Sequence, residues 1–209
     1  MDIIASLQWR YATKKFNPKA LLSQEVIDQL SEAFRLSAVS YGLQPVRMLV
    51  IQNKKKQEAI KPMAMHQPQV ADCSHLLVLC IERSMNKTFI KEHFERVQKL
   101  RNTSKELLEP FEQFLSHHFA QKSEEEYQQW ARNQIYLIMG KLLAACALLK
   151  VDACPMEGFD PEQLDEFLGL EALNLKSVLL LPVGKRAEDD IFADLPKVRR
   201  TQEELIIKM

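Results

Sequence analysis

An uninterrupted apolar run between His75 and Glu82 constrains the fold of this chain more than any other feature. The run reads Leu-Leu-Val-Leu-Cys-Ile, without the alternation of polar and apolar residues that marks a strand with one face in water. It predicts a strand buried on both faces, so other elements must cover the sheet on both sides. The clearest helix signal covers residues 124–149. Ser123 can cap it, acids fill its first turn, and its second half is apolar nearly all round, which is typical of a buried helix.

The remaining segments predict a helix-rich α+β fold with a small central sheet. Helical spacing of apolar residues and β-rich runs give further helices at 2–10, 23–37, 54–63 and 86–121, a helix that begins at Pro161, and strands at 46–52 and 177–183. We expect Pro110 to interrupt the helical segment 86–121. Few glycines and no linker-like tract indicate a single domain over residues 1–209. Residues 201–209 are too apolar for a free tail, and we expect them to pack on a partner subunit as an added strand or arm.

Composition excludes several classes of function. The chain has 28 basic and 28 acidic residues, so no net field attracts nucleic acid or an anionic membrane. Its four cysteines show no CxxC spacing, and no His, Cys, Asp and Glu cluster has metal-ligand spacing, so we predict no metal. The N-terminus does not read as a signal peptide, and the longest apolar stretch, 135–149, is too short to span a bilayer. We therefore expect a cytoplasmic protein.

Two short basic clusters stand at opposite ends of this neutral chain. Arg10 and Lys14 lie near the start, and Lys197 and Arg199 near the end. A guanidinium fork and an ammonium both suit phosphate, although each pair taken alone could equally be solvated surface charge.

Two loops between the basic clusters could approach a ligand. Residues 37–45 and 154–160 contain Gly42 and Gly158, whose backbones can come close to a bound group, although each loop could equally be an ordinary turn. The chain has neither a G-x-G-x-x-G nor a P-loop motif, and no G-x-S-x-G nucleophile.

Taken together and in order, these four segments resemble the FMN-dependent nitroreductase family, of the oxygen-insensitive NAD(P)H type. Leu181-Pro182-Val183-Gly184 is a further similar stretch. The resemblance implies a three-layer sandwich in which helices cover a small, mostly antiparallel sheet. It also implies a homodimer whose C-terminal arms are exchanged between the subunits.

The resemblance also implies a role for each segment of an FMN site. Arg10, Lys197 and Arg199 would hold the phosphate, and Tyr11 and Ala12 would line the ribityl chain. The two residues assigned to the chemistry are Lys14, near N1 and O2 of the flavin, and Glu157. The loop of Pro155, Met156, Glu157 and Gly158 would direct the backbone N–H groups of its last two residues to N5 and O4. His66 and Gln69 would face the pyrimidine edge, and Ala38, Val39 and Ser40 would come from the other subunit, with Gly42 freeing the backbone of the same loop.

The function implied is that of an oxidoreductase. NADH or NADPH would deliver hydride to the flavin and leave, and an electron-poor acceptor such as a nitroaromatic or a quinone would then take two electrons in a ping-pong cycle.

Ala12 and Val39 lack hydroxyls that are common in the family, and His66 stands where an Asn is usual. The alternatives are an enone reductase, a dehalogenase, a peptide-ring oxidase, a flavin or dihydropteridine reductase of the same fold, or a non-catalytic FMN-binding protein. Segment 86–121 is expected to cover the pocket.

Overall fold

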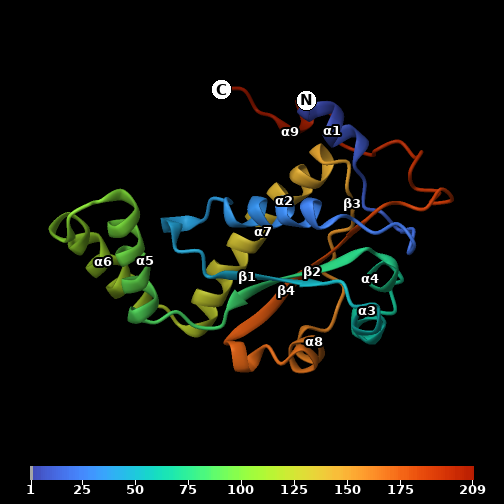
Figure 1. Cartoon of the computed structure of the whole chain (residues 1–209). Helices are drawn as coiled ribbons and strands as arrows, with labels where there is room; N and C mark the ends of the chain where they lie inside the picture. Colours follow the sequence, from blue (N-terminus) through green and yellow to red (C-terminus); the bar gives the residue numbers. More distant parts are fainter. Residues whose placement is uncertain (1) are drawn as a thin grey trace.

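The computed structural model describes residues 2–209 and is built around a four-stranded antiparallel sheet (Figure 1). The strand order is β1-β2-β4-β3, with β1 at Val46–Ile51, β2 at His75–Glu82, β3 at Asp152–Ala153 and β4 at Leu175–Gly184. Val46 pairs with Ile81, His75 with Val183, and Asp152 with Gly184. The three predicted strands are confirmed. β3 was not predicted, because two residues carry no periodicity.

Nine helices are present in residues 2–209. They are α1 (Ile3–Trp9), α2 (Gln24–Arg35), α3 (Lys54–Ile60), α4 (Gln69–Asp72), α5 (Lys87–Arg101), α6 (Lys105–Ala120), α7 (Glu124–Leu148), α8 (Pro161–Leu168) and α9 (Gln202–Leu205). Short 3₁₀ turns lie at Ser40–Gly42, Lys61–Ala64 and Glu171–Leu173. The predicted caps form: the side chain of Ser123 accepts from the Glu126 amide in a capping box, and that of Asp160 accepts from the amides of Glu162 and Gln163.

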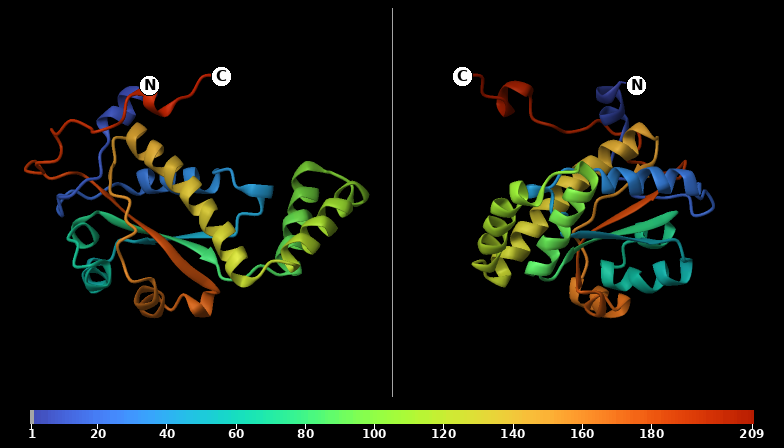
Figure 2. Two further views of the ribbon diagram at one scale, coloured as in Figure 1. Left: turned by 180° about the vertical axis from the view of Figure 1, so that it is seen from behind. Right: turned by 60° about the vertical axis from the view of Figure 1, so that its left-hand side comes forward.

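Alternate residues of β2 enter two different cores, which is why its apolar run is unbroken. Leu77, Leu79 and Ile81 pack with α2 and α7, whereas Leu76, Val78 and Cys80 pack on the face that α3, α4 and α8 cover. Figures 1 and 2 show the two helical layers on either side of the sheet. The predicted three-layer arrangement of helices, sheet and helices is confirmed.

The predicted interruption at Pro110 is wrong. Helix α6 runs through Pro110, and the break between α5 and α6 falls at Asn102, whose φ of 51° is left-handed, followed by Ser104 at the helix N-cap. Asn tolerates the left-handed region better than most residues. Pro110 lies exposed in the second turn of α6, so the carbonyl that loses its N–H partner, that of Glu106, can turn to water. The α5–α6 hairpin stands at one end of the molecule, away from α3, α4 and α8 (Figure 2).

The C-terminal segment runs back past α1 after β4 ends. The Lys197 ammonium donates to the carbonyl of Gln8 in α1. Beyond α9 the chain is extended, and Leu205, Ile206 and Ile207 are 56%, 53% and 86% exposed. Within residues 2–209 no helix combines the length and the apolarity needed to cross a membrane.

Candidate active site

The short strand β3 brings the N-terminal motif to the sheet. Ala12 forms a parallel bridge with Ala153, and the Thr13 amide donates to the Ala153 carbonyl at 3.2 Å. On its other side Ala153 pairs with Val183 of β4. Residues 10–14 therefore run along the free edge of β3, next to the start of the loop at 155–158.

The C-terminal segment closes a cavity over this motif. The cavity has a volume of about 340 Å³. Its lining residues come from the two ends of the chain: Arg10, Tyr11, Ala12 and Lys14 from one, and Phe192, Leu195, Pro196, Lys197, Val198 and Arg199 from the other. The structure thus brings together the two basic clusters that the sequence separates by more than 180 residues.

Like charges crowd this cavity. Burial and the neighbouring Arg199 guanidinium lower the pKa of Arg10. Burial together with the Arg10 and Arg199 guanidinium groups lowers the pKa of Lys197. An anion placed among these groups would relieve the repulsion between them. The cavity is therefore electrostatically suited to an anion.

The Arg186 guanidinium stacks on Trp9 and Tyr11, the two aromatic residues that flank Arg10. The Arg186 Cζ lies 4.5 Å from the ring centroid of Trp9 and 4.6 Å from that of Tyr11, and Arg186 Nε donates to Asp152 Oδ1 at 2.7 Å. Arginine suits such a position because its planar group can stack and hydrogen-bond at once. The side chains that flank Arg10 are thereby fixed to the end of the sheet.

The loop Pro155–Gly158 offers two unused backbone donors. Met156 exchanges both backbone hydrogen bonds with Leu180 of β4, which anchors the loop. Within residues 2–209 neither the Glu157 N–H nor the Gly158 N–H has a hydrogen-bond partner. Lys14 Nζ lies 4.0 Å from Cys154 Sγ, so its ammonium stands at the start of the loop. Two adjacent free amides beside an ammonium can bind an acceptor-rich edge.

Residues 65–69 lie against this loop. The Gln67 side-chain amide donates to the Gly158 carbonyl at 2.9 Å, and a Cβ on Gly158 would stand 3.2 Å from Gln67 Nε2. His66 is exposed, with a left-handed φ of 56°. Gln69 is buried, and its Oε1 has no partner in residues 2–209. This carbonyl oxygen is free to accept a hydrogen bond from water or from a bound group.

The loop with Ala38, Val39, Ser40 and Gly42 is not part of this cavity. It follows α2 and lies toward the α5–α6 hairpin, whereas the cavity lies at the α1 and β3 end of the molecule (Figure 1). The Ser40 amide donates to Gln134 Oε1 of α7 at 2.8 Å, and Gly42 has a φ of 71°. A contact between this loop and the cavity would have to be made across two subunits.

Four polar residues that shape the site were not predicted. Gln67 holds Gly158, Gln134 holds Ser40, Tyr136 donates its phenol hydrogen to Glu157 Oε1 at 2.9 Å, and Asp190 contacts residues 11–15. The partners of Gln67, Gln134 and Asp190 lie more than 90 positions away in the sequence, so no local pattern could have identified them.

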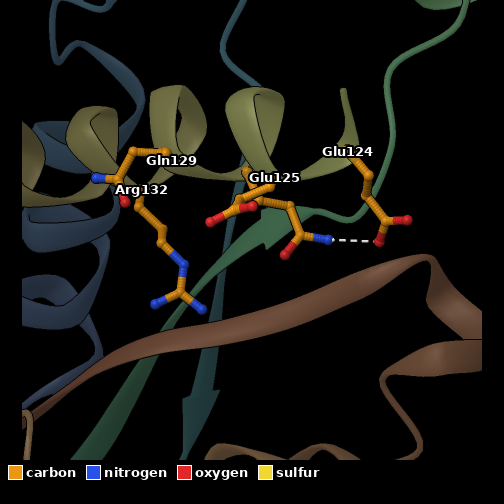
Figure 3. Close-up of a pocket in the computed structure, with 5 residues that line it drawn as sticks. Glu124, Glu125, Gln129 and Arg132 are labelled. Carbon is orange, nitrogen blue, oxygen red and sulfur yellow. Dashed lines mark hydrogen bonds between the residues drawn. The ribbon is translucent and has the colours of Figure 1, made fainter. Parts of the chain in front are cut away.

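A second hollow, along the first turns of α7, carries none of the predicted residues. Glu124, Glu125, Gln128, Gln129 and Arg132 line it, and Gln128 donates to Glu124 at 2.8 Å (Figure 3). All five side chains come from the first turns of one helix, so it is a solvated charged face. In the part of the chain that the structure describes, no three His, Cys, Asp or Glu side chains gather to hold a metal ion.

Comparison with known proteins identifies the family. The model of the nitroreductase family matches residues 7–185. The chain belongs to the nitroreductase family. It is 32% identical to the major NAD(P)H-flavin oxidoreductase of Aliivibrio fischeri over 98% of this chain and 97% of that protein. It is 28% identical to the oxygen-insensitive NAD(P)H nitroreductase of Salmonella typhimurium, with 95% of each chain covered.

Solved structures share the fold of this nitroreductase-family chain. A nitroreductase-like protein of Streptococcus mutans has a TM-score of 0.83 at 25% identity, over 99% of this chain and 97% of that one. A putative nitroreductase of Exiguobacterium sibiricum in complex with FMN has a TM-score of 0.86 at 20% identity, over 100% and 98%. The predictions of the family and of a nitroreductase-like fold are confirmed, and the names of the relatives agree with the predicted enzyme class.

Proposed function

We propose that this nitroreductase-family protein is an FMN-dependent oxidoreductase that uses NADH or NADPH to reduce an electron-poor acceptor such as a nitroaromatic or a quinone. Residues 1–209 would act as one FMN-binding domain. The observation that carries the proposal is the cavity of four cations from both chain ends beside two free backbone amides. The relatives named NAD(P)H nitroreductase and NAD(P)H-flavin oxidoreductase support it.

The residues present fit both ends of FMN. At the phosphate end, Arg10, Lys197 and Arg199 would supply charge to a dianion, whose binding would relieve the crowding that lowers two of their pKa values. Tyr11 and Ala12 line the wall between this end and Lys14, where the ribityl chain would pass.

At the ring end, the N–H groups of Glu157 and Gly158 would donate to the acceptor edge of the flavin. Lys14 would bring positive charge to the pyrimidine side, and Gln69 Oε1 is a free acceptor for a ring N–H. His66 stands on the same side. FMN, when bound, supplies the hydride and electron chemistry, while the chain orients the ring and sets its electrostatics.

We also propose that the protein works as a homodimer with exchanged C-terminal arms. β1 is an edge strand, and a groove of about 310 Å³ lies beside it. Four of its eight lining residues are apolar: Phe34, Val46, Met48 and Val50. Leu205 ends α9, and the chain is extended from Ile206 onward. Leu205, Ile206 and Ile207 are apolar and exposed, so this segment could add to the edge of a sheet in a partner subunit. In such a dimer the loop 38–42 would reach the flavin of the partner.

A spectrum tests the cofactor and the reaction together. The purified protein is expected to be yellow, with about one FMN per chain, and NADH or NADPH added without oxygen should bleach the flavin absorbance. Addition of a nitroaromatic or a quinone should then restore it. A bound flavin that neither nucleotide bleaches would indicate the non-catalytic FMN-binding alternative. A colourless protein that gains no thermal stability from FMN would refute the proposal.

Deletion of residues 201–209 tests the exchanged arm. Sedimentation of the full chain should give a dimer at micromolar concentration, and the truncated chain should dissociate more readily. A flavin-loaded full-length monomer would contradict the dimer, whereas an equally stable truncated dimer would contradict only the role of the arm. The acceptor specificity is a separate measurement, in which enones and dihydropteridines compete with nitroaromatics and quinones.

A further inference from the structure

Asp190 is a buried carboxylate that contacts both halves of the cation cavity. It is only 4% exposed. Its Oδ2 accepts from the Tyr11 hydroxyl at 2.8 Å, the Lys14 amide at 3.0 Å and the Lys15 amide at 3.1 Å, and its Oδ1 accepts from the Phe192 amide at 3.2 Å. Burial opposes the ionised form, but these hydrogen bonds prevail and lower the pKa of Asp190.

The two segments that meet at Asp190 are those that carry the cations. Tyr11 and Lys14 line one wall of the cavity, and Phe192 begins the segment that lines the other. Other contacts also join the two ends of the chain here, among them the backbone hydrogen bond from the Ala187 amide to the Lys15 carbonyl at 2.9 Å. They also include the exposed ion pair of Lys15 with Asp189 and the contact of Lys197 with the Gln8 carbonyl. Asp190 is the buried charge that joins the two segments.

We propose that Asp190 is a positioning residue, whose ionised carboxylate fixes residues 11–15 and 192–199 in the geometry that receives a phosphate monoester. This rests on the proposed FMN site. The Asp190 carboxylate does not itself bind the ligand, since a second anion would repel phosphate. It acts through the backbone and side chains that it holds.

The direction in which phosphate binding changes when Asp190 is neutralised distinguishes a positioning role from a purely electrostatic one. If Asp190 acted only as a nearby negative charge, its neutralisation would strengthen phosphate binding. If it positions the cations, neutralisation loosens the cavity and weakens phosphate binding. Hydrogen bonds to a charged group are stronger than those between neutral groups, so the loss of even one predicts about a tenfold or larger rise in the Kd of FMN.

The test compares FMN with riboflavin, which shares the ring and the ribityl chain but lacks the phosphate. Apoprotein is titrated with each flavin, and binding is followed by flavin fluorescence. For Asp190→Asn we expect the Kd of FMN to rise about tenfold or more, with a change of less than about threefold for riboflavin. Asp189→Asn is the matched control. It removes the same charge one residue away, at a side chain that contacts only the exposed Lys15 ammonium, and it should not weaken FMN binding.

Tyr11→Phe gives an independent reading if Asp190→Asn does not fold. It removes one of the four donors to Asp190 and leaves the ring against Arg186. The ratio of FMN to riboflavin affinity should fall here too, by less than in Asp190→Asn.

Three results would overturn the inference. They are FMN binding that is unchanged or tighter in Asp190→Asn, an equal loss for FMN and riboflavin, and an equal loss in the Asp189→Asn control. A wild-type apoprotein that does not prefer FMN to riboflavin would instead refute the proposed phosphate site. That result is seen before any variant is made, so the two failures are distinguishable.

Discussion

Replacement of Gln67 by Leu should weaken FMN binding although Gln67 need not touch the cofactor. The Gln67 side-chain amide donates to the Gly158 carbonyl at 2.9 Å and to the Ala64 carbonyl at 3.2 Å. The first bond fixes the Gly158 carbonyl, and with it the loop that carries the free N–H groups of Glu157 and Gly158. Leucine has a similar length but cannot donate.

The structure sets the size of the effect. Each neutral hydrogen bond contributes about 0.5–1.5 kcal/mol net, so the two bonds of Gln67 together contribute about 1–3 kcal/mol. Without these bonds, part of the binding free energy of FMN is used to order the loop. The Kd of FMN then rises by a factor of about 5 to 150, since about 1.4 kcal/mol corresponds to tenfold. Gln67→Glu should cost more, because a carboxylate cannot donate and would repel the carbonyl of Gly158.

Two measurements on each variant test this reasoning. Urea unfolding of the apoprotein gives the loss of stability, and fluorescence titration gives the Kd of FMN. Gln163→Leu is the matched control, because Gln163 donates at 2.7 Å to Asp160 just after the same loop and is exposed. If Gln67→Leu lowers apoprotein stability by the expected amount but binds FMN as tightly as Gln163→Leu, the amides of the loop are not part of the FMN site.

Four further changes have defined outcomes. Arg199→Ala should mainly raise the Kd of FMN, because the phosphate charge is the same in every redox state. Lys14→Ala at saturating FMN should mainly slow flavin reduction in stopped-flow measurements. An undiminished rate would show that Lys14 takes no part in the reaction. Gly184→Ala should destabilise the fold by about 1–3 kcal/mol in urea unfolding, because a Cβ would stand 3.0 Å from the Ser74 backbone nitrogen; an unchanged midpoint would contradict the tight packing. Burial and a nearby ammonium lower the pKa of His75, so the unfolded chain binds its proton more readily and stability should fall as the pH drops through about 6.5; His75→Asn should flatten this dependence, and an unaltered pH profile would count against it.

The sequence predicted the larger elements because each carries its own pattern. The unbroken apolar run of β2 gave a central strand, and the cap and apolar periodicity gave α7, to within a residue at each end. The error at Pro110 has a local cause. A proline in the first turns of a helix exposes one carbonyl to water and need not end the helix, whereas Asn102 in the left-handed region does end α5.

The short strand β3 was missed although it organises the site. Its two residues form a strand only because β4 lies on one side and residues 12–13 lie on the other. Such pairing is imposed by neighbours that are distant in sequence, so neither propensity nor periodicity in Asp152 and Ala153 could reveal it.

The cation cavity also depends on contacts between residues that are distant in sequence. Motif resemblance therefore identified the cations that line it but not the residues that hold them in place. Arg10 and Arg199 belong to short recognisable motifs at the chain ends. Asp190 and Gln67 do not, because an isolated Asp or Gln is a common surface residue. Their importance comes from what they hold: a buried carboxylate with four donors, and an amide that fixes the direction of one carbonyl. The four cations Arg10, Lys14, Lys197 and Arg199 meet around one cavity only because the fold brings the two chain ends together. Asp190 is part of that junction, because it accepts from the Tyr11 hydroxyl and from the Lys14 and Lys15 amides and so fixes the N-terminal motif beside the C-terminal segment.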